Sequence, residues 1–225
     1  MQRKLSYNNP LPASINTTPA IAPEFPINIG QIVRIIFAQP YNGGSVGNVF
    51  ATLADAQTMS SWTAFFAATD GTAMFYTPIM SNSEIGDAKP LQVAADSNVT
   101  YGGNPEFYGM GGSMLNGEFR NKDAPSLNSM DALTAFSQQN SGGQSSLSAY
   151  LLNQDGYVIG MGSQSGATVS EIQPINIFDF WYGTQTTKGY ATATVTKMGL
   201  WLPPYWSDNL VFIPPTSTFD LRMLM

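Results

Sequence analysis

Carboxylates beside aromatic residues are the groups in this sequence best suited to chemistry. Asp179 stands two positions before Trp181 in the segment FDFWYG, and Asp208 stands two positions after Trp206. A glycosidase needs two carboxyl groups about 5–10 Å apart across a sugar, and aromatic rings can lie against sugar faces. The commoner arrangement buries such aromatics in a core or an interface, with the charges pointing outward along alternating strands. The candidate sugar contacts are Trp181, Tyr182, Trp201 and Trp206.

The sequence contains no histidine and no cysteine. Ser-His-Asp catalysis, histidine-bound zinc, thiolate nucleophiles and disulfides therefore cannot be built from it. Asp70 and Asp155 stand in turn sequences that lack the 12-residue loop and terminal glutamate of an EF-hand calcium site. We expect no enzymatic activity, no cofactor and no metal ion.

A glycine-rich stretch at residues 101–117, YGGNPEFYGMGGSMLNG, invites comparison with phosphate-binding loops. A Walker loop needs G-x-x-x-x-G-K-[ST], and a dinucleotide loop needs G-x-G-x-x-G between a strand and a helix. Neither spacing is present. The pairs Gly-Gly and Asn-Pro are typical of turns, so we predict a close-packed structural loop rather than a ligand loop.

The chain has 225 residues, a net charge of −6 and 11% charged residues, against roughly 25% in ordinary soluble domains. Its polar surface must therefore consist of Asn, Gln, Ser, Thr and Gly. Such a surface suits close contact between proteins, although adhesins and lectin-like domains share this bias. The nine basic residues are scattered, which argues against a nucleic-acid partner. No segment contains close to the roughly 18 consecutive apolar residues of a membrane-spanning helix, so we expect no membrane span. We also see no export signal.

The clearest local pattern lies at residues 52–80. Thr52 and Asp55 have the spacing of a capping box, in which a threonine side chain accepts from a backbone N–H three residues later. Asp70 and Gly71 predict the end of the helix, and residues 73–79 have strand composition up to Pro78. One face of this helix is predicted to contain Leu53, Ala56, Met59, Trp62 and Phe66.

Further elements are predicted on both sides of this unit. Residues 29–37 read as a strand covered on both faces, and residues 114–120 as another strand. A second helix is predicted from Asn128, ending at residues 141–143. Asp155-Gly156 predicts a hairpin with a type I′ turn between residues 147–153 and 157–161. The remaining predicted strands are residues 91–93, 99–101, 170–181 with Pro174 at a bulge or edge, 190–202 and 210–213.

Both ends of the chain contain more apolar residues than solvent-exposed terminal segments usually do. Residues 1–26 contain five prolines, which predicts an extended arm that is either a plain tail or ordered against a neighbouring subunit. The C-terminal segment LRMLM should dock on its own domain or, as we slightly favour, on a neighbour. The candidate assembly residues are Leu11, Ile15, Ile21, Phe25, Leu221, Met223, Leu224 and Met225.

The order of these features resembles a known group of proteins. Trp62, TDGTAMFYTP, YGGN, Leu133 and SLSAYLLNQDGYVIG follow one another within residues 25–162. This order is similar to that of small virion structural proteins of tailed bacteriophages, particularly crAss-like phages of Bacteroidetes. The resemblance implies a mixed α/β or β-rich subunit of a ring, tail or head–tail connector, and it brings no catalytic residues.

We therefore expect a β-rich α+β protein with mixed or antiparallel sheets and two short helices. The expected parts are an extended arm (1–26), an α+β core (27–162) and an all-β C-terminal third (163–225) packed on the core or a neighbour. The expected function is that of a non-enzymatic virion subunit, made in the host cytoplasm, which binds copies of itself in a ring or tube and other virion proteins. The alternative is a carbohydrate-binding or adhesin module.

Overall fold

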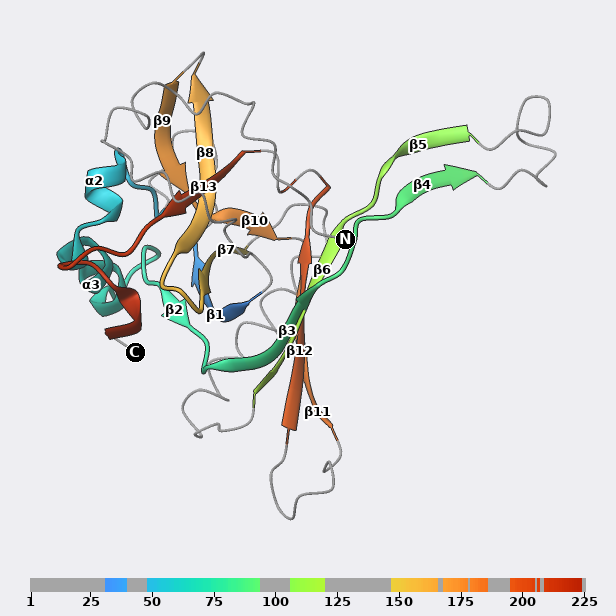
Figure 1. The fold of residues 1–225 in the computed structure, drawn as a ribbon, viewed down its shortest axis with the longest axis horizontal. Helices are drawn as coiled ribbons and strands as arrows, with labels where there is room; N and C mark the ends of the chain where they lie inside the picture. The colour runs from blue at the N-terminus through green and yellow to red at the C-terminus, as the bar shows by residue number, and fades with distance from the viewer. Residues whose placement is uncertain are drawn as a thin grey trace.

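The protein is β-rich and antiparallel, as its sequence predicts (Figure 1). The computed structural model describes residues 31–39, 48–93, 106–119, 147–165, 168–177, 179–185, 195–204, 206 and 209–223. Its strands are β1 (Ile32–Ala38), β2 (Phe75–Tyr76), β3 (Met80–Ile85), β4 (Pro90–Val93), β5 (Glu106–Met110), β6 (Ser113–Phe119), β7 (Leu147–Asn153), β8 (Val158–Ser165), β9 (Thr168–Gln173), β10 (Ile175–Ile177), β11 (Asp179–Gln185), β12 (Val195–Leu202) and β13 (Leu210–Ile213). Its helices are α2 (Leu53–Ala56), α3 (Met59–Ala67) and a 3-10 helix (Leu221–Met223). The predicted arm (1–26), the predicted strand at 99–101 and the predicted second helix from Asn128 lie outside the described residues.

The larger sheet has the strand order β13-β8-β7-β1-β2, with β9 beside β8 and β10 beside β7. Strands β1 and β7 pair in the middle of this sheet, and all seven residues of β7 are buried. Alternate residues of a strand point to opposite faces, so a strand buried throughout must be covered on both sides. The predicted burial of both faces of β1 is confirmed.

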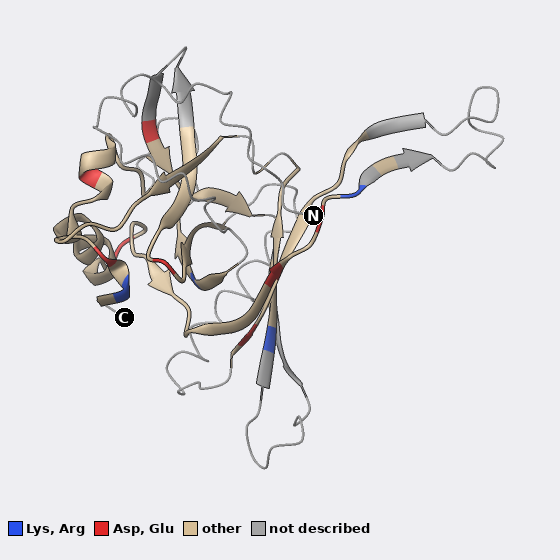
Figure 2. Cartoon of the chain, in the orientation of Figure 1, with Lys and Arg blue, Asp and Glu red and all other residues tan. Residues whose placement is uncertain are grey.

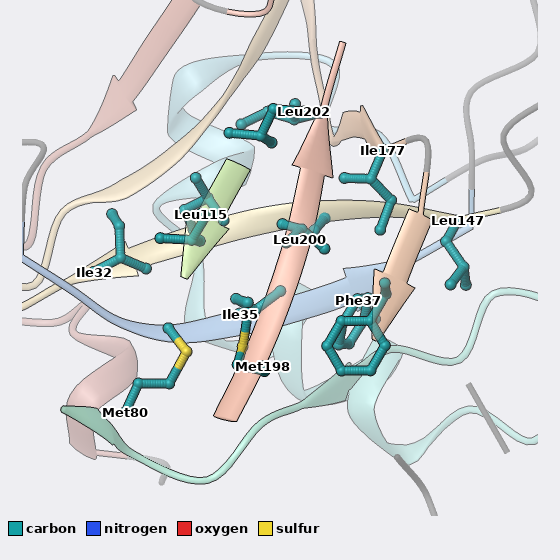
Figure 3. Close-up of a cluster of buried hydrophobic side chains, with 14 of the residues drawn as sticks. Ile32, Ile35, Phe37, Met80, Leu115, Leu147, Ile177, Met198, Leu200 and Leu202 are labelled. Atoms are coloured by element: carbon teal, nitrogen blue, oxygen red, sulfur yellow. The ribbon is translucent and has the colours of Figure 1, made fainter. Parts of the chain in front are cut away.

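The smaller sheet has the order β11-β12-β6-β3 and packs against one face of the larger sheet. Figure 3 shows Ile35 and Phe37 of β1 facing Leu200 and its neighbours on β12. The rings of Phe37 and Phe180 meet edge to face with centroids 4.9 Å apart. This first core therefore lies between two sheets, as in a β-sandwich.

The residues after 162 complete both sheets. Strand β8 runs across position 162, β9 and β10 pair with β8 and β7, and β11 and β12 join β6. The predicted pairing between the 170–181 and 190–202 regions is present as the β11–β12 hairpin, and β13 matches the predicted strand at 210–213. The predicted strand at 170–181 is instead divided into three strands. Pro174, which has no N–H to donate, lies between β9 and β10.

The predicted helix at the start of the 52–80 unit is two helices. Its capping box is confirmed, because the Thr52 side chain accepts a hydrogen bond from the Asp55 backbone N–H at 3.1 Å. However, the first helix ends at Ala56, whose carbonyl oxygen accepts a hydrogen bond from the indole Nε1 of Trp62 at 2.8 Å. Thr58 is extended, with φ −99° and ψ 111°, and a second helix begins after it.

The strand after these helices is shorter than predicted. Only Phe75 and Tyr76 pair with β1. Thr77 continues the contact, because its side-chain oxygen accepts from the Ile35 N–H at 3.0 Å while its own N–H donates to the Ile35 carbonyl at 2.9 Å. Pro78 has no backbone donor, so the ladder ends there.

The predicted hairpin between β7 and β8 is present, but its turn differs from the prediction. Gly156 has φ +91°, whereas Asp155 is not among the described residues with positive φ. The Gly156 N–H donates to the Asn153 carbonyl at 3.1 Å, and the Asn153 N–H donates to the Tyr157 carbonyl at 3.0 Å. This is the three-residue loop in which glycine takes the left-handed position, instead of a type I′ turn.

The C-terminal segment is hydrogen-bonded to this hairpin through Arg222. The Asp220 carboxylate accepts hydrogen bonds from Nε and Nη2 of Arg222, at 2.9 Å and 2.6 Å. Nη1 of Arg222 donates to the Gln154 carbonyl at 3.0 Å. The Arg222 side chain occupies the space beside Gly156 that a Cβ would fill, with its Nε 2.9 Å from that position.

This contact predicts a pH dependence of stability. Hydrogen bonding to Arg222 lowers the pKa of Asp220 below its ordinary value. A carboxyl whose pKa is lowered on folding stabilises the protein above its unfolded pKa of about 3.9 and loses this effect as pH falls through the lower folded pKa. We expect Asp220→Asn to lower the free energy of unfolding at pH 7 by up to about 1 kcal/mol. Thermal unfolding at pH 7 and in acid measures this difference, which should vanish in acid; exposed Asp87→Asn is the control. An equal difference at both pH values would contradict the assignment.

Candidate functional site

The outer face of the smaller sheet carries two of the predicted tryptophans. Met198, Leu200 and Leu202 of β12 point into the first core, so the alternate residues of this strand point outward. Register places Trp201 between Met114 of β6 and Asp179 of β11. We define the tryptophan face as the outward residues Glu84, Met114, Asn116, Glu118, Trp181, Lys197, Gly199 and Trp201.

A glycine positions one of the two indoles. Trp181 lies opposite Gly199 in the register, and its Nε1, Cε2 and Cζ2 atoms lie within the space that a Cβ on Gly199 would need. The absence of a side chain at Gly199 therefore lets the Trp181 indole rest against the backbone of β12. Trp181 is partly exposed and Trp201 is 40% exposed, so this face presents aromatic surface to its surroundings.

Polar residues surround this aromatic surface. Glu118 is buried, and its Oε2 accepts a hydrogen bond from Nδ2 of Asn82 at 2.8 Å. Asn82 has φ +53° and lies at the irregularity where the register of β3 with β6 shifts. Lys197 lies opposite Glu118 in the β12–β6 register, and Glu84 is exposed on β3. The face thus has an apolar centre with charges of both signs around it.

Trp206, a further candidate sugar contact, is not part of this surface. Trp206 is buried in the first core, where its N–H donates to the Pro203 carbonyl at 3.3 Å. A ring buried in this way cannot stack on a sugar, so Trp206 is a core residue. The side chain of Tyr182 and residue Asp208 lie outside the described parts.

A two-stranded ribbon projects from the same sheet (Figure 1). The register of Ile85 with Leu115 continues unshifted to that of Pro90 with Met110, so β4 and β5 prolong β3 and β6. In the described part of the chain, β4 and β5 pair only with each other. Leu91 on this ribbon is 56% exposed. We call β4 and β5 the projecting ribbon.

The ribbon corrects the loop predicted for the glycine-rich stretch. Residues 106–110 and 113–119 form β5 and β6, and only Gly111 and Gly112 lie between them. Gly111 donates its N–H to the Lys89 carbonyl at 2.8 Å, which carries the ladder across this junction. A Cβ on Gly112 would collide with the carbonyl oxygen of Leu202 at the end of β12. Gly111 and Gly112 therefore let neighbouring backbone segments approach closely at the base of the ribbon.

The terminal assembly candidates have separate positions. A second core contains Ile36, Tyr150, Trp62 and Phe219. Leu221 is buried in this second core, so it packs on its own chain rather than on a neighbour. Met223 is 84% exposed. The remaining terminal candidates lie outside the described residues: Leu11, Ile15, Ile21, Phe25, Leu224 and Met225.

Charged groups are sparse and scattered over the described chain (Figure 2). Arg34 is buried on β1, where Nη1 donates to the Thr77 carbonyl at 2.9 Å and the guanidinium carbon lies 5.4 Å from the Tyr76 ring centroid. Burial lowers the pKa of Arg34. This arginine joins β1 to the end of β2 and is not placed to bind a ligand.

Neither a metal site nor a membrane-spanning helix occurs among the described residues. They hold no group of three or more acidic, His or Cys side chains able to bind a metal ion. Among the helices that the structure describes, none is long and apolar enough to cross a membrane.

Comparisons with known proteins add one distant likeness. No protein-family model matches the sequence, and no curated protein matches it. Among solved structures, the chain is similar to one described as the virion of a native gene transfer agent (GTA) particle. The identity is 14%, the TM-score is 0.29, and the match covers 59% of this chain and 83% of that chain. A TM-score at this level carries no conclusion about function.

Proposed function

We propose that this chain is a non-enzymatic structural subunit of a phage virion, from the tail, a ring or the head–tail connector region. The subunit binds copies of itself in a ring or tube and contacts other virion proteins. It is made in the host cytoplasm and ends in the virion.

The projecting ribbon is the observation that carries this proposal. A two-stranded hairpin is marginally stable in water, because it buries little apolar area without a third strand or a covering layer. Here β4 and β5 leave the sheet and expose Leu91. Contact with another protein would bury Leu91 and stabilise the ribbon, as expected for a subunit of an assembly.

Composition and sequence order support the same role. Charged residues make up 11% of the chain, so protein surfaces can approach each other with little charge to desolvate. The order of Trp62, TDGTAMFYTP, YGGN and the SLSAYLLNQDGYVIG hairpin resembles that of phage virion structural proteins. Exposed apolar residues occur at three further separate places, Ile79, Trp201 and Met223.

Native mass spectrometry of the purified full chain, over a range of concentrations, tests the proposal. We expect oligomers larger than a dimer at high concentration, or on addition of the products of neighbouring genes. Heterologous contacts produce such assemblies, because they form rings when the rotation closes and filaments when it does not. A chain that stays monomeric at high concentration and does not bind those products would contradict the proposal.

A carbohydrate-binding module is the second candidate, and the tryptophan face is the observation that favours it. Trp181 and Trp201 lie on one outward face beside Asn116 and Lys197, which offers stacking surface and hydrogen-bonding groups. A glycan array distinguishes the two functions. A monomer that binds a glycan, and loses this binding in Trp201→Ala without loss of fold, would favour the module over the structural subunit.

A further inference from the structure

The projecting ribbon cannot cover its apolar surface with its own tryptophan face. The Gly86 N–H donates to the Met114 carbonyl at 2.9 Å, and Met114 pairs with Trp201, so Gly86 lies level with Trp201. Leu91 lies five residues beyond Gly86, which is about 16 Å along a strand that rises about 3.3 Å per residue. The ribbon leads away from the body of the protein (Figure 1). A tryptophan face that receives Leu91 must therefore belong to another molecule.

The tryptophan face has the anatomy of a surface that receives such a partner. Its centre holds Trp201, Trp181 and Met114, while Glu84 and Lys197 lie around them. An apolar centre within a polar rim is the usual arrangement of protein interfaces, and tryptophan is enriched among the residues that dominate their binding energy.

We propose that the projecting ribbon of one copy lies on the tryptophan face of the next copy, with Leu91 against Trp201. This inference rests on the proposed function, and it names the surface through which copies meet. A second copy is the favoured partner because one chain carries both surfaces. If this contact repeats from copy to copy, each subunit inside the assembly has its ribbon covered by one neighbour and its tryptophan face covered by another.

Charge placement agrees with this pairing. Asp87 and Lys89 are exposed at the base of the ribbon and share the strand face of Leu91, because residues two apart point to the same side. Glu84 and Lys197 edge the receiving face. The face carries Glu84, Glu118 and Lys197, so Lys89 and Asp87 of the ribbon base can be matched with Glu84 and Lys197 across the contact. Because the two surfaces differ, the contact is heterologous and forms a ring or a continuing chain.

The absence of cysteine permits a direct test by disulfide crosslinking. The full chain carrying Leu91→Cys and Trp201→Cys is purified, oxidised mildly and separated on a non-reducing gel. We expect a ladder of dimers, trimers and larger species that collapses on reduction. An intramolecular bond cannot give this result, because a disulfide joins Cα atoms less than about 7 Å apart. The pair Leu91→Cys and Met114→Cys repeats the test if Trp201→Cys unfolds the chain.

Three control variants separate the possible arrangements. Each single-cysteine variant should stay uncrosslinked, as should the pair Leu91→Cys and Ile79→Cys, since Ile79 is 62% exposed but lies between β2 and β3, outside both surfaces. Dimers from Leu91→Cys alone would show ribbon-to-ribbon pairing and overturn the inference. A wild-type chain that assembles while neither test pair crosslinks would overturn the inference and leave the structural role intact. A wild-type chain that stays monomeric even with the products of neighbouring genes would overturn both.

Discussion

Trp62→Ala is expected to lower the free energy of unfolding by about 3–5 kcal/mol, the range for removing a large buried aromatic side chain. Trp62 is fully buried at the centre of the second core. Its ring centroid lies 4.7 Å from that of Phe50 and 5.2 Å from that of Tyr150. Alanine would leave a cavity among these rings. It would also remove the indole N–H that donates a hydrogen bond to the Ala56 carbonyl oxygen.

Chemical denaturation followed by circular dichroism measures this loss. Trp201→Ala is the matched control, because it removes the same side chain from the exposed tryptophan face, where we expect a change below about 1 kcal/mol. A similar loss in both variants would contradict the central role of Trp62 in the second core. Trp201→Ala should instead weaken assembly.

Gly112→Ala is expected to lower the free energy of unfolding by about 1–3 kcal/mol, the usual cost of forcing extra volume into a packed site. The new Cβ would collide with the backbone carbonyl oxygen of Leu202, which cannot rotate away as a side chain would. The end of β12 and the base of the projecting ribbon must separate to make room. We therefore also expect the Leu91–Trp201 crosslink to weaken, because the ribbon changes direction.

Gly86→Ala provides the matched control on the opposite strand of the same ribbon base. A Cβ there would lie 3.6 Å from its nearest neighbour, the Met114 carbonyl oxygen, which is ordinary contact. Thermal unfolding and the crosslinking gel should show little change for this variant. If the two glycine variants behave alike, Gly112 does not set the direction of the ribbon.

Local signals in the sequence predict the elements that depend on a few neighbouring residues. The capping box at Thr52 and Asp55 is confirmed because its hydrogen bond spans three residues. The hairpin around Gly156 is confirmed for the same reason, although its loop has three residues where a two-residue turn was predicted. The division between α2 and α3 could not be read from periodicity, since the spacing of Ala56, Met59 and Trp62 continues unbroken across the point where the first helix ends.

The candidate site depends on pairings between distant segments, and these are not visible in local patterns. Strand alternation separates Trp201 from Leu200 and Leu202, but it does not say which set faces the core. The deciding fact is the packing of the smaller sheet on β1, which buries Met198, Leu200 and Leu202 of β12. The isolated tryptophan at 206 has no such strand context, and its burial follows from the turn after Pro203. The glycine-rich stretch was misread at residues 106–110, which form β5 where turn residues predicted a loop, whereas the predicted strand at 114–120 is confirmed as β6.

The pairing of β1 with β7 also has a consequence for how this chain folds. These two central strands are joined across more than a hundred residues, as the hydrogen bond from Ser148 Oγ to the Ala38 carbonyl shows, with a separation of 110 positions. During synthesis β1 emerges early and must wait for β7 before the larger sheet can close. Sheets built from such distant pairings fold on a scale of about milliseconds to seconds. The apolar β1 strand therefore stays without its partner until β7 has been synthesised, and it needs protection from aggregation during that interval.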